Sequence, residues 1–243
     1  LSDKLTGDEE SWRIFIDNEI DKIGIYSFPK NVTYDTEERV KEDSIVSNID
    51  MELKRISFKE ENIQSMIKLP IDLHILSILW IENVGKILDK NFYDGSYGNR
   101  LIENDTLEET GGNKEWSPYL FKPYFNEYEN WRDKGLNIAE NFYSEGKDSL
   151  IIMLDIKRFY YSVHFTRAMF ESFVKDKGLD TAILRINDLV FTIIKRYSKL
   201  YHSMVTTEEG KRNTILPIGF LPSSILANWY LDDFDKRILD RIN

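Results

Sequence analysis

Asp155 stands at the end of an apolar run and directly before a cluster of aromatic residues. The run, SLIIMLDI at residues 149–156, is β-prone and follows the turn-forming EGKD, which predicts a short buried strand. A carboxylate at the end of a buried strand is costly unless hydrogen-bond donors or a cation pair with it. Two interpretations remain open from these residues: Asp155 caps the helix that follows, or it is a metal ligand.

A second stretch of interest, LPIGFLPSSILAN, occupies residues 216–228. It contains a Pro-x-Gly turn in front of a serine-capped helix start. Gly219 would let the backbone come close to a ligand, because glycine has no Cβ atom. Taken alone, this stretch could belong to any loop. Together with DIKRFYYSV at residues 155–163 it forms a specific pair of motifs.

Several basic residues could contact phosphate groups. Arg100 lies in the turn-forming SYGNR, where it is either a phosphate or template contact or half of a salt bridge that anchors the turn. Between the two motifs, five basic residues outweigh Glu208 and Glu209 and leave a local charge of +3. These five residues are Lys195, Arg196, Lys199, Lys211 and Arg212. A solvated helix face is the alternative interpretation for any one of them, since lysine and arginine are mostly exposed in any protein.

The two motifs together resemble those of reverse transcriptases, particularly the bacterial ones. DIKRFYYSV is similar to the first catalytic motif of that family, Asp-Ile-Lys-x-Phe-Tyr/Phe-x-Ser-Ile. LPIGFLPSSILAN is similar to the second palm motif, Leu-Pro-Gln-Gly-x-x-x-Ser-x-x-Leu-Ala-Asn, with Ile218 in place of the glutamine. YGNR resembles the Tyr-Gly-x-Arg of the fingers. The resemblance spans residues 66–243 in the expected order, and it is greatest to uncharacterised and antiphage-defence reverse transcriptases.

This resemblance implies a right-hand polymerase in which two Mg²⁺ ions assist nucleotidyl transfer. Such ions stabilise the attacking and leaving oxygens, and hard oxygen ligands suit them. Asp155 matches the first metal-binding aspartate, with the Ile156 carbonyl oxygen as a further ligand. Tyr160 matches the residue under the incoming sugar, where a bulky ring favours deoxynucleotides by clashing with a 2′ hydroxyl. Gly219 and Ile218 match the nucleotide-binding turn, and the missing glutamine leaves template use open.

Residues 230–233 read Tyr-Leu-Asp-Asp and match the Tyr-x-Asp-Asp that holds the metal ions in reverse transcriptases. In that family the quartet lies at the tight turn of a β-hairpin. Here the surrounding apolar residues recur at helical spacing, so we expect Asp232 and Asp233 on the solvated side of a helix. We therefore predict that this quartet is not the metal site. The chain would then contain one catalytic aspartate, end before the other two, and not polymerise by itself.

Composition narrows the class of protein. The 243 residues are 42% hydrophobic and 30% charged, as in globular proteins, and contain neither an apolar run of membrane-spanning length nor a signal-peptide pattern. The absence of cysteine excludes disulfides and thiolate metal sites and fits the cytoplasm. Residues 1–65 carry −7 of the net charge of −10. The nearly neutral remainder therefore leaves room for a basic patch that binds nucleic acid.

Hydrophobic periodicity predicts a helix-rich α+β protein built around the strand at residues 149–156. Helices are expected over residues 8–26, 36–66, 71–88, 118–146, 165–176 and 180–203, and from residue 223 onward.

With the resemblance, the chain divides into an acidic helical extension at residues 1–65 and fingers at residues 66–148 and 164–215. Residues 149–163 would form the palm strand with the first motif, and residues 216–243 the second palm motif and its helix. The expected function is template-directed DNA synthesis by an RNA-directed DNA polymerase, with antiphage defence as its setting. The expected partners are an RNA or DNA template-primer, dNTPs, and a protein bound through the acidic extension.

Two other functions fit the same residues. An RNA-templated RNA polymerase would share the palm, but Tyr160 argues against it because such an enzyme must accept a 2′ hydroxyl. A non-catalytic interaction scaffold derived from an enzyme would bind a protein partner through its acidic N-terminal region.

Overall fold

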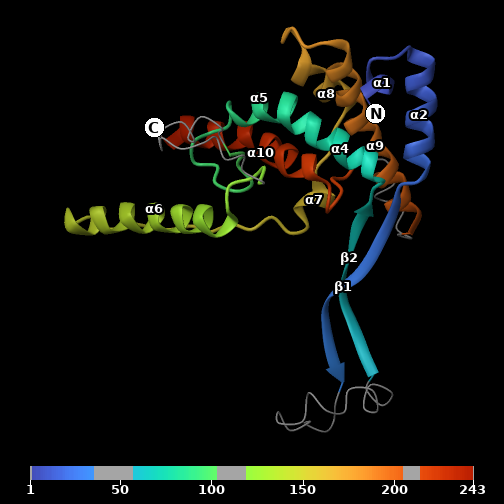
Figure 1. Ribbon diagram of the computed structural model, residues 1–243. Helices are drawn as coiled ribbons and strands as arrows, with labels where there is room; N and C mark the ends of the chain where they lie inside the picture. The colour runs from blue at the N-terminus through green and yellow to red at the C-terminus, as the bar shows by residue number, and fades with distance from the viewer. Residues whose placement is uncertain (1, 36–56, 103–118, 205–213, 243) are drawn as a thin grey trace, which may run out of the picture.

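The computed structural model describes residues 2–35, 57–102, 119–204 and 214–242. Within these ranges the protein is helix-rich and contains one small antiparallel sheet, so the α+β prediction is confirmed at that level. Figure 1 shows a body of packed helices from which a long two-stranded hairpin and one helix, α6, project in different directions. No helix in the described ranges is long and apolar enough to cross a lipid bilayer.

Among its described residues, the N-terminal region begins with helices and continues with two strands. Its elements are α1 (Ser2–Leu5), α2 (Glu9–Asp21), β1 (Gly24–Asp35) and β2 (Ser57–Lys68). Asp8 caps α2 by accepting a hydrogen bond of 2.9 Å from the Ser11 backbone N–H. The two strands pair antiparallel, from Gly24 opposite Lys68 to Asp35 opposite Ser57. The helix predicted over residues 8–26 is confirmed as far as Asp21, whereas the helix predicted over residues 36–66 is wrong for residues 57–66, which belong to β2.

Strand β2 was predicted as helix because its charged residues hide the alternation that marks a strand. In its last part, Ser65 and Ile67 are buried while Lys68 is exposed, which is the two-residue period of a strand. The partner strand lies far away along the chain. Pairing with a distant segment decided the conformation here, and local periodicity does not report such pairing.

The helical body follows the sequence predictions closely. It consists of α4 (Ile71–Trp80), the π-helical turn η2 (Ile81–Gly85), α5 (Lys86–Asp89), α8 (Arg167–Val174), α9 (Thr181–Met204) and α10 (Leu221–Ile242). The first three form one uninterrupted helical segment, so the helix predicted over residues 71–88 is confirmed, as are those over 165–176, 180–203 and from 223 onward. Helix α9 packs against α4, α8 and α2 and forms the centre of the body.

Two buried hydrogen bonds connect three of these helices. The indole N–H of Trp80 in α4 donates to the Asn187 side-chain oxygen in α9 at 2.9 Å. The Asn187 amide in turn donates to the Phe170 carbonyl in α8 at 2.8 Å. Because both residues are buried, each needs this pairing to offset the loss of water.

Helix α6 (Tyr124–Ser144) confirms the helix predicted over residues 118–146, but none of its residues is buried. The apolar run that follows it is extended and has no strand partner among the described residues. Leu150 and Leu154 are 84% and 87% exposed. The buried strand predicted at residues 149–156 is therefore wrong for the described structure. Its composition favours a strand, but a strand forms only where another strand lies beside it to pair.

Candidate functional site

The two sequence motifs meet in the structure. Tyr160 lies in the short helix α7 (Phe159–Ser162), and its carbonyl oxygen accepts a hydrogen bond of 2.9 Å from the Leu216 backbone N–H. On the other side of the second motif, the Ile67 N–H of β2 donates to the Ile218 carbonyl at 2.9 Å. The start of the second motif is thus held between the first motif and the base of the hairpin.

Beside these contacts lies an open pocket of about 420 Å³. The pocket brings together three residues that the sequence predicted for nucleotide binding: Tyr160, Ile218 and Gly219. Its remaining lining residues are Gln64, Phe220, Leu221 and Ser224. Of these, Phe220, Leu221 and Ser224 lie in the second motif, but Gln64 comes from β2. No sequence signal could have found Gln64, since its place depends on the pairing of the hairpin base with Ile218.

The backbone conformation favours glycine at position 219. Its φ angle of +84° lies in the left-handed region, which residues with a side chain rarely adopt. In addition, a Cβ atom at this position would come within 2.9 Å of the Met66 side-chain methyl group. The group that the Gly219 backbone approaches in the structure is Met66 of β2, and the expected approach to a ligand stays a prediction.

Tyr160 presents a neutral phenol to the pocket. Burial raises the pKa of Tyr160 above its ordinary value, and a hydrogen bond with the Ser224 side chain opposes that shift in part. Tyr161, the next residue along the chain, does not line the pocket. It packs instead against Tyr201, with the ring centroids 5.0 Å apart. Of these two adjacent tyrosines, Tyr160 is therefore the one at the pocket.

Asp155 is exposed and does not line this pocket. Its carboxylate and the Ile156 carbonyl are hard oxygen donors of the kind that Mg²⁺ prefers. In the described ranges, however, no group of three or more histidine, aspartate or glutamate side chains gathers as a metal site would require. The donor type therefore fits magnesium, but the described donors are too few for two ions.

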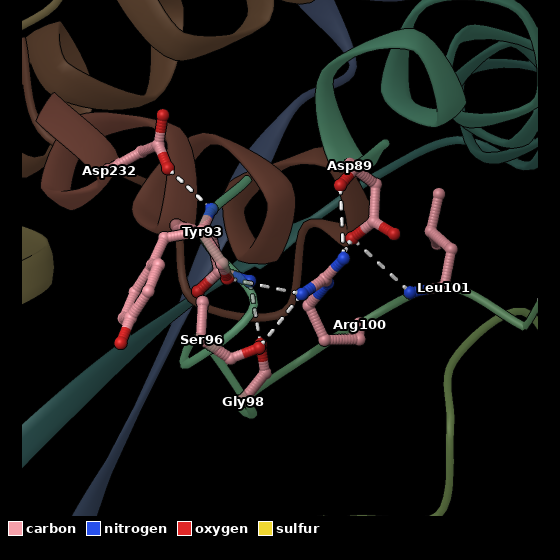
Figure 2. A network of polar contacts seen from close by, with 8 residues as sticks. Asp89, Tyr93, Ser96, Gly98, Arg100, Leu101 and Asp232 are labelled. Carbon is pink, nitrogen blue, oxygen red and sulfur yellow. Dashed lines mark hydrogen bonds and ion pairs between the residues drawn. The ribbon is translucent and has the colours of Figure 1, made fainter. Parts of the chain in front are cut away.

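Arg100 anchors a loop, as one of its two sequence interpretations expects. Figure 2 shows its guanidinium group turned toward Asp89 at the end of α5, with an ion pair of 3.0 Å. It also donates to the carbonyl oxygens of Ser96 at 3.0 Å and Asp89 at 3.1 Å. Because these bonds occupy most of its donors and both side chains are largely buried, the arrangement disfavours a phosphate or template contact.

Asp232 and Asp233 lie in helix α10, so the prediction that Tyr-Leu-Asp-Asp is helical is confirmed. The expected exposure holds for Asp233, whose side chain is 79% exposed and pairs with Arg237 at 2.8 Å. It is wrong for Asp232, whose side chain is only 16% exposed. Asp232 accepts a hydrogen bond of 2.8 Å from the Tyr93 backbone N–H and so holds the loop of Arg100 against α10 (Figure 2).

Replacing the two aspartates should therefore lower the free energy of unfolding by different amounts. We expect Asp232→Ala to lower the free energy of unfolding by about 1–3 kcal/mol, because it leaves the Tyr93 N–H without its acceptor. Asp233→Ala should change it by less than about 0.5 kcal/mol, since its ion pair is exposed. Urea denaturation of both variants measures the difference. Both should retain substantial nucleotide incorporation in the full-length protein. A folded variant without incorporation would make the quartet the metal site after all.

The remaining basic candidates are divided between the described and undescribed parts of the chain. Lys195 is exposed on α9 with its ammonium group 5.9 Å from the centre of the Phe191 ring. Arg196 pairs with Asp21 of α2 at 3.6 Å, which fits a structural role. Lys211 and Arg212 lie outside the described residues.

Tyr197 and its tyrosine neighbours lie next to β2, the strand that carries Gln64 of the pocket. Tyr197 of α9 is fully buried and donates a hydrogen bond of 2.8 Å to the Ser65 carbonyl of β2. Burial raises its pKa well above the ordinary value, and the neighbouring Tyr161 and Tyr201 raise it further. Burial also raises the pKa of Tyr160 and Tyr161. The folded protein therefore favours the neutral phenols more strongly than the unfolded chain does.

This difference predicts a loss of stability in alkali. Below the ordinary tyrosine pKa of about 10 both states are protonated and stability is constant, whereas above it the unfolded chain releases protons that the folded protein retains. The free energy of unfolding should fall as the pH rises through about 10 and beyond. Urea denaturation between about pH 8 and pH 11 measures the slope. Tyr197→Phe should be less stable at pH 8 but should show a shallower alkaline decline. An equal decline in both proteins would contradict this origin.

No family model, curated protein or solved structure matches this chain. The functional assignment therefore rests on the motifs and on the geometry of the pocket.

Proposed function

We propose that this chain forms the fingers and part of the palm of a template-directed DNA polymerase of the reverse-transcriptase kind. The observation that carries the proposal is the pocket that joins Tyr160 of the first motif to Ile218 and Gly219 of the second. These stretches are far apart in the sequence, and the resemblance expects both at an incoming nucleotide.

The chemistry of the pocket supports a deoxynucleotide as its ligand. The Tyr160 ring supplies a flat, bulky wall suited to a sugar face, and Ser224 lies beside it in the lining of the pocket. The left-handed turn at Gly219 allows a ligand to lie against the backbone. Under this proposal Asp155 and the Ile156 carbonyl are ligands of Mg²⁺, which when bound supplies charge stabilisation for phosphoryl transfer. Further carboxylates are needed to complete that site.

Nucleotide binding by the purified protein tests the proposal. Titration with each dNTP and rNTP in the presence of Mg²⁺, followed by calorimetry, should show binding that favours dNTPs. Gly219→Ala should weaken that binding by about tenfold or more, because Gly219 lines the pocket and the added methyl group takes up space there and displaces the end of the Met66 side chain. Gly178→Ala is the matched control. Gly178 also has a left-handed φ of +64°, but a Cβ there would meet no atom within 4 Å.

The control separates backbone strain from a role in the pocket. Both alanine variants carry the cost of a left-handed backbone, about 1–2 kcal/mol, and should melt at lower temperatures than the parent protein. Only Gly219→Ala should lose nucleotide affinity. Absence of dNTP binding by the folded parent protein, or equal losses in the two variants, would refute the proposal.

The interaction scaffold stays as a second candidate because of one observation. Helix α6 and the apolar run after it expose large hydrophobic side chains, among them Trp131, Leu150 and Leu154. Exposed apolar surface of this kind is common at protein interfaces. A folded protein that binds no nucleotide would favour the scaffold over the polymerase.

A further inference from the structure

Gln64 of the N-terminal hairpin is part of the pocket wall. It lies in β2 two residues before Met66, and Met66 pairs with Ile218 in a parallel bridge. Successive residues of a strand point to opposite faces, so Gln64 and Met66 share one face while Ser65 and Ile67 face the helical body. The base of the hairpin therefore contributes a wall to the candidate site as well as a support for it.

Gln64 carries the uncommitted polar group of this pocket. The lining contains three polar side chains: Gln64, Tyr160 and Ser224. Tyr160 and Ser224 lie side by side, since the Ser224 side chain opposes in part the rise in the pKa of Tyr160. The Gln64 carboxamide forms no hydrogen bond with another described residue, although an amide can donate two and accept two. A ligand in this pocket would therefore meet one free amide among mostly apolar walls.

The charge and polarity of the pocket lining indicate which part of a nucleotide would lie there. None of the lining residues is charged, so the pocket offers no partner to a triphosphate. A base would leave several edge groups without partners in the apolar remainder of the lining. A deoxyribose has apolar faces and a single free hydroxyl at its 3′ carbon. In such a pocket, the apolar side chains can contact the faces of the sugar and the single free amide can hydrogen-bond its hydroxyl.

We propose that Gln64 is a specificity-determining residue that hydrogen-bonds the 3′ hydroxyl of a deoxynucleotide bound in this pocket. This inference rests on the proposed function for the identity of the ligand. It adds that the N-terminal hairpin, which lies before the residues that resemble a polymerase, supplies part of the nucleotide site.

The test pairs a residue change with a change in the ligand. The affinities of dTTP and of its 2′,3′-dideoxy analogue are measured with Mg²⁺ for the parent protein and for Gln64→Leu, which keeps the side-chain size but has no polar atoms. Gln64→Leu should weaken dTTP binding about five- to tenfold, the usual effect of one hydrogen bond to a neutral group. It should change binding of the dideoxy analogue by less than about twofold, because that ligand lacks the hydroxyl.

Ile63→Ala is the control for the hairpin. Ile63 is the preceding residue of β2, is exposed and does not line the pocket, so its loss should leave both affinities unchanged. Equal weakening of both ligands by Gln64→Leu, or no weakening of either, would overturn the role of Gln64 while the proposed function stands. Failure of the parent protein to bind dTTP would instead refute the proposed function and, with it, this inference. Melting temperatures show that each variant is folded.

Discussion

Replacing Asp155 with asparagine should abolish nucleotide incorporation by the full-length protein. Under the proposed function, the carboxylate is a negatively charged ligand for Mg²⁺, and the amide keeps its shape but loses its charge. A loss of about a thousandfold or more is expected, which corresponds to about 4 kcal/mol of transition-state stabilisation. Primer extension with radiolabelled dNTPs measures the effect.

The same substitution should leave the fold intact. Asp155 is exposed, so its replacement should change the free energy of unfolding by less than about 0.5 kcal/mol. Asp148→Asn provides a matched control, because Asp148 is also an exposed aspartate and lies at the start of the same extended segment. It should incorporate nucleotides normally. An active Asp155→Asn protein would remove Asp155 from the catalytic site, whatever the behaviour of the control.

The helices were predictable because each carries its own pattern. In α9, buried residues such as Ile186, Val190 and Ile194 recur every four positions, so the sequence alone shows which face packs inward. The helical state of Asp232 follows from the same kind of pattern. Its burial does not, because its partner is the Tyr93 N–H of a distant loop. Periodicity along one helix assigns faces but does not report which loop covers them.

The strands were harder to predict because a strand depends on a partner elsewhere in the chain. Residues 57–68 form a strand because β1 lies beside them, and residues 149–156 do not form one, although they have the stronger apolar character. Strand formation depends on a partner that local sequence does not reveal. The candidate site shows the same division. Tyr160 and Gly219 could be predicted from their motifs, whereas Gln64 reaches the pocket only through the pairing of Met66 with Ile218.

Replacing Tyr160 with alanine should relax the choice of sugar in the full-length protein. If the ring lies under the incoming sugar, it excludes a 2′ hydroxyl by steric overlap, and overlap in a packed site costs a few kcal/mol. The preference for dNTPs over rNTPs should therefore fall by tens-fold or more, while some dNTP incorporation remains. The ratio of kcat/KM for dCTP and CTP measures this preference.

Two companion variants separate the ring from its hydroxyl and from its neighbour. Tyr160→Phe removes the hydroxyl but keeps the ring, so steric exclusion predicts an unchanged sugar preference. Tyr161→Ala removes a ring of the same size that packs against Tyr201 away from the pocket, and it should destabilise the protein without changing that preference. Relaxed sugar choice in Tyr160→Phe would mean that the hydroxyl selects the sugar. Relaxation in Tyr161→Ala alone would move the selecting ring by one residue, to a side chain that the structure has packed outside the pocket.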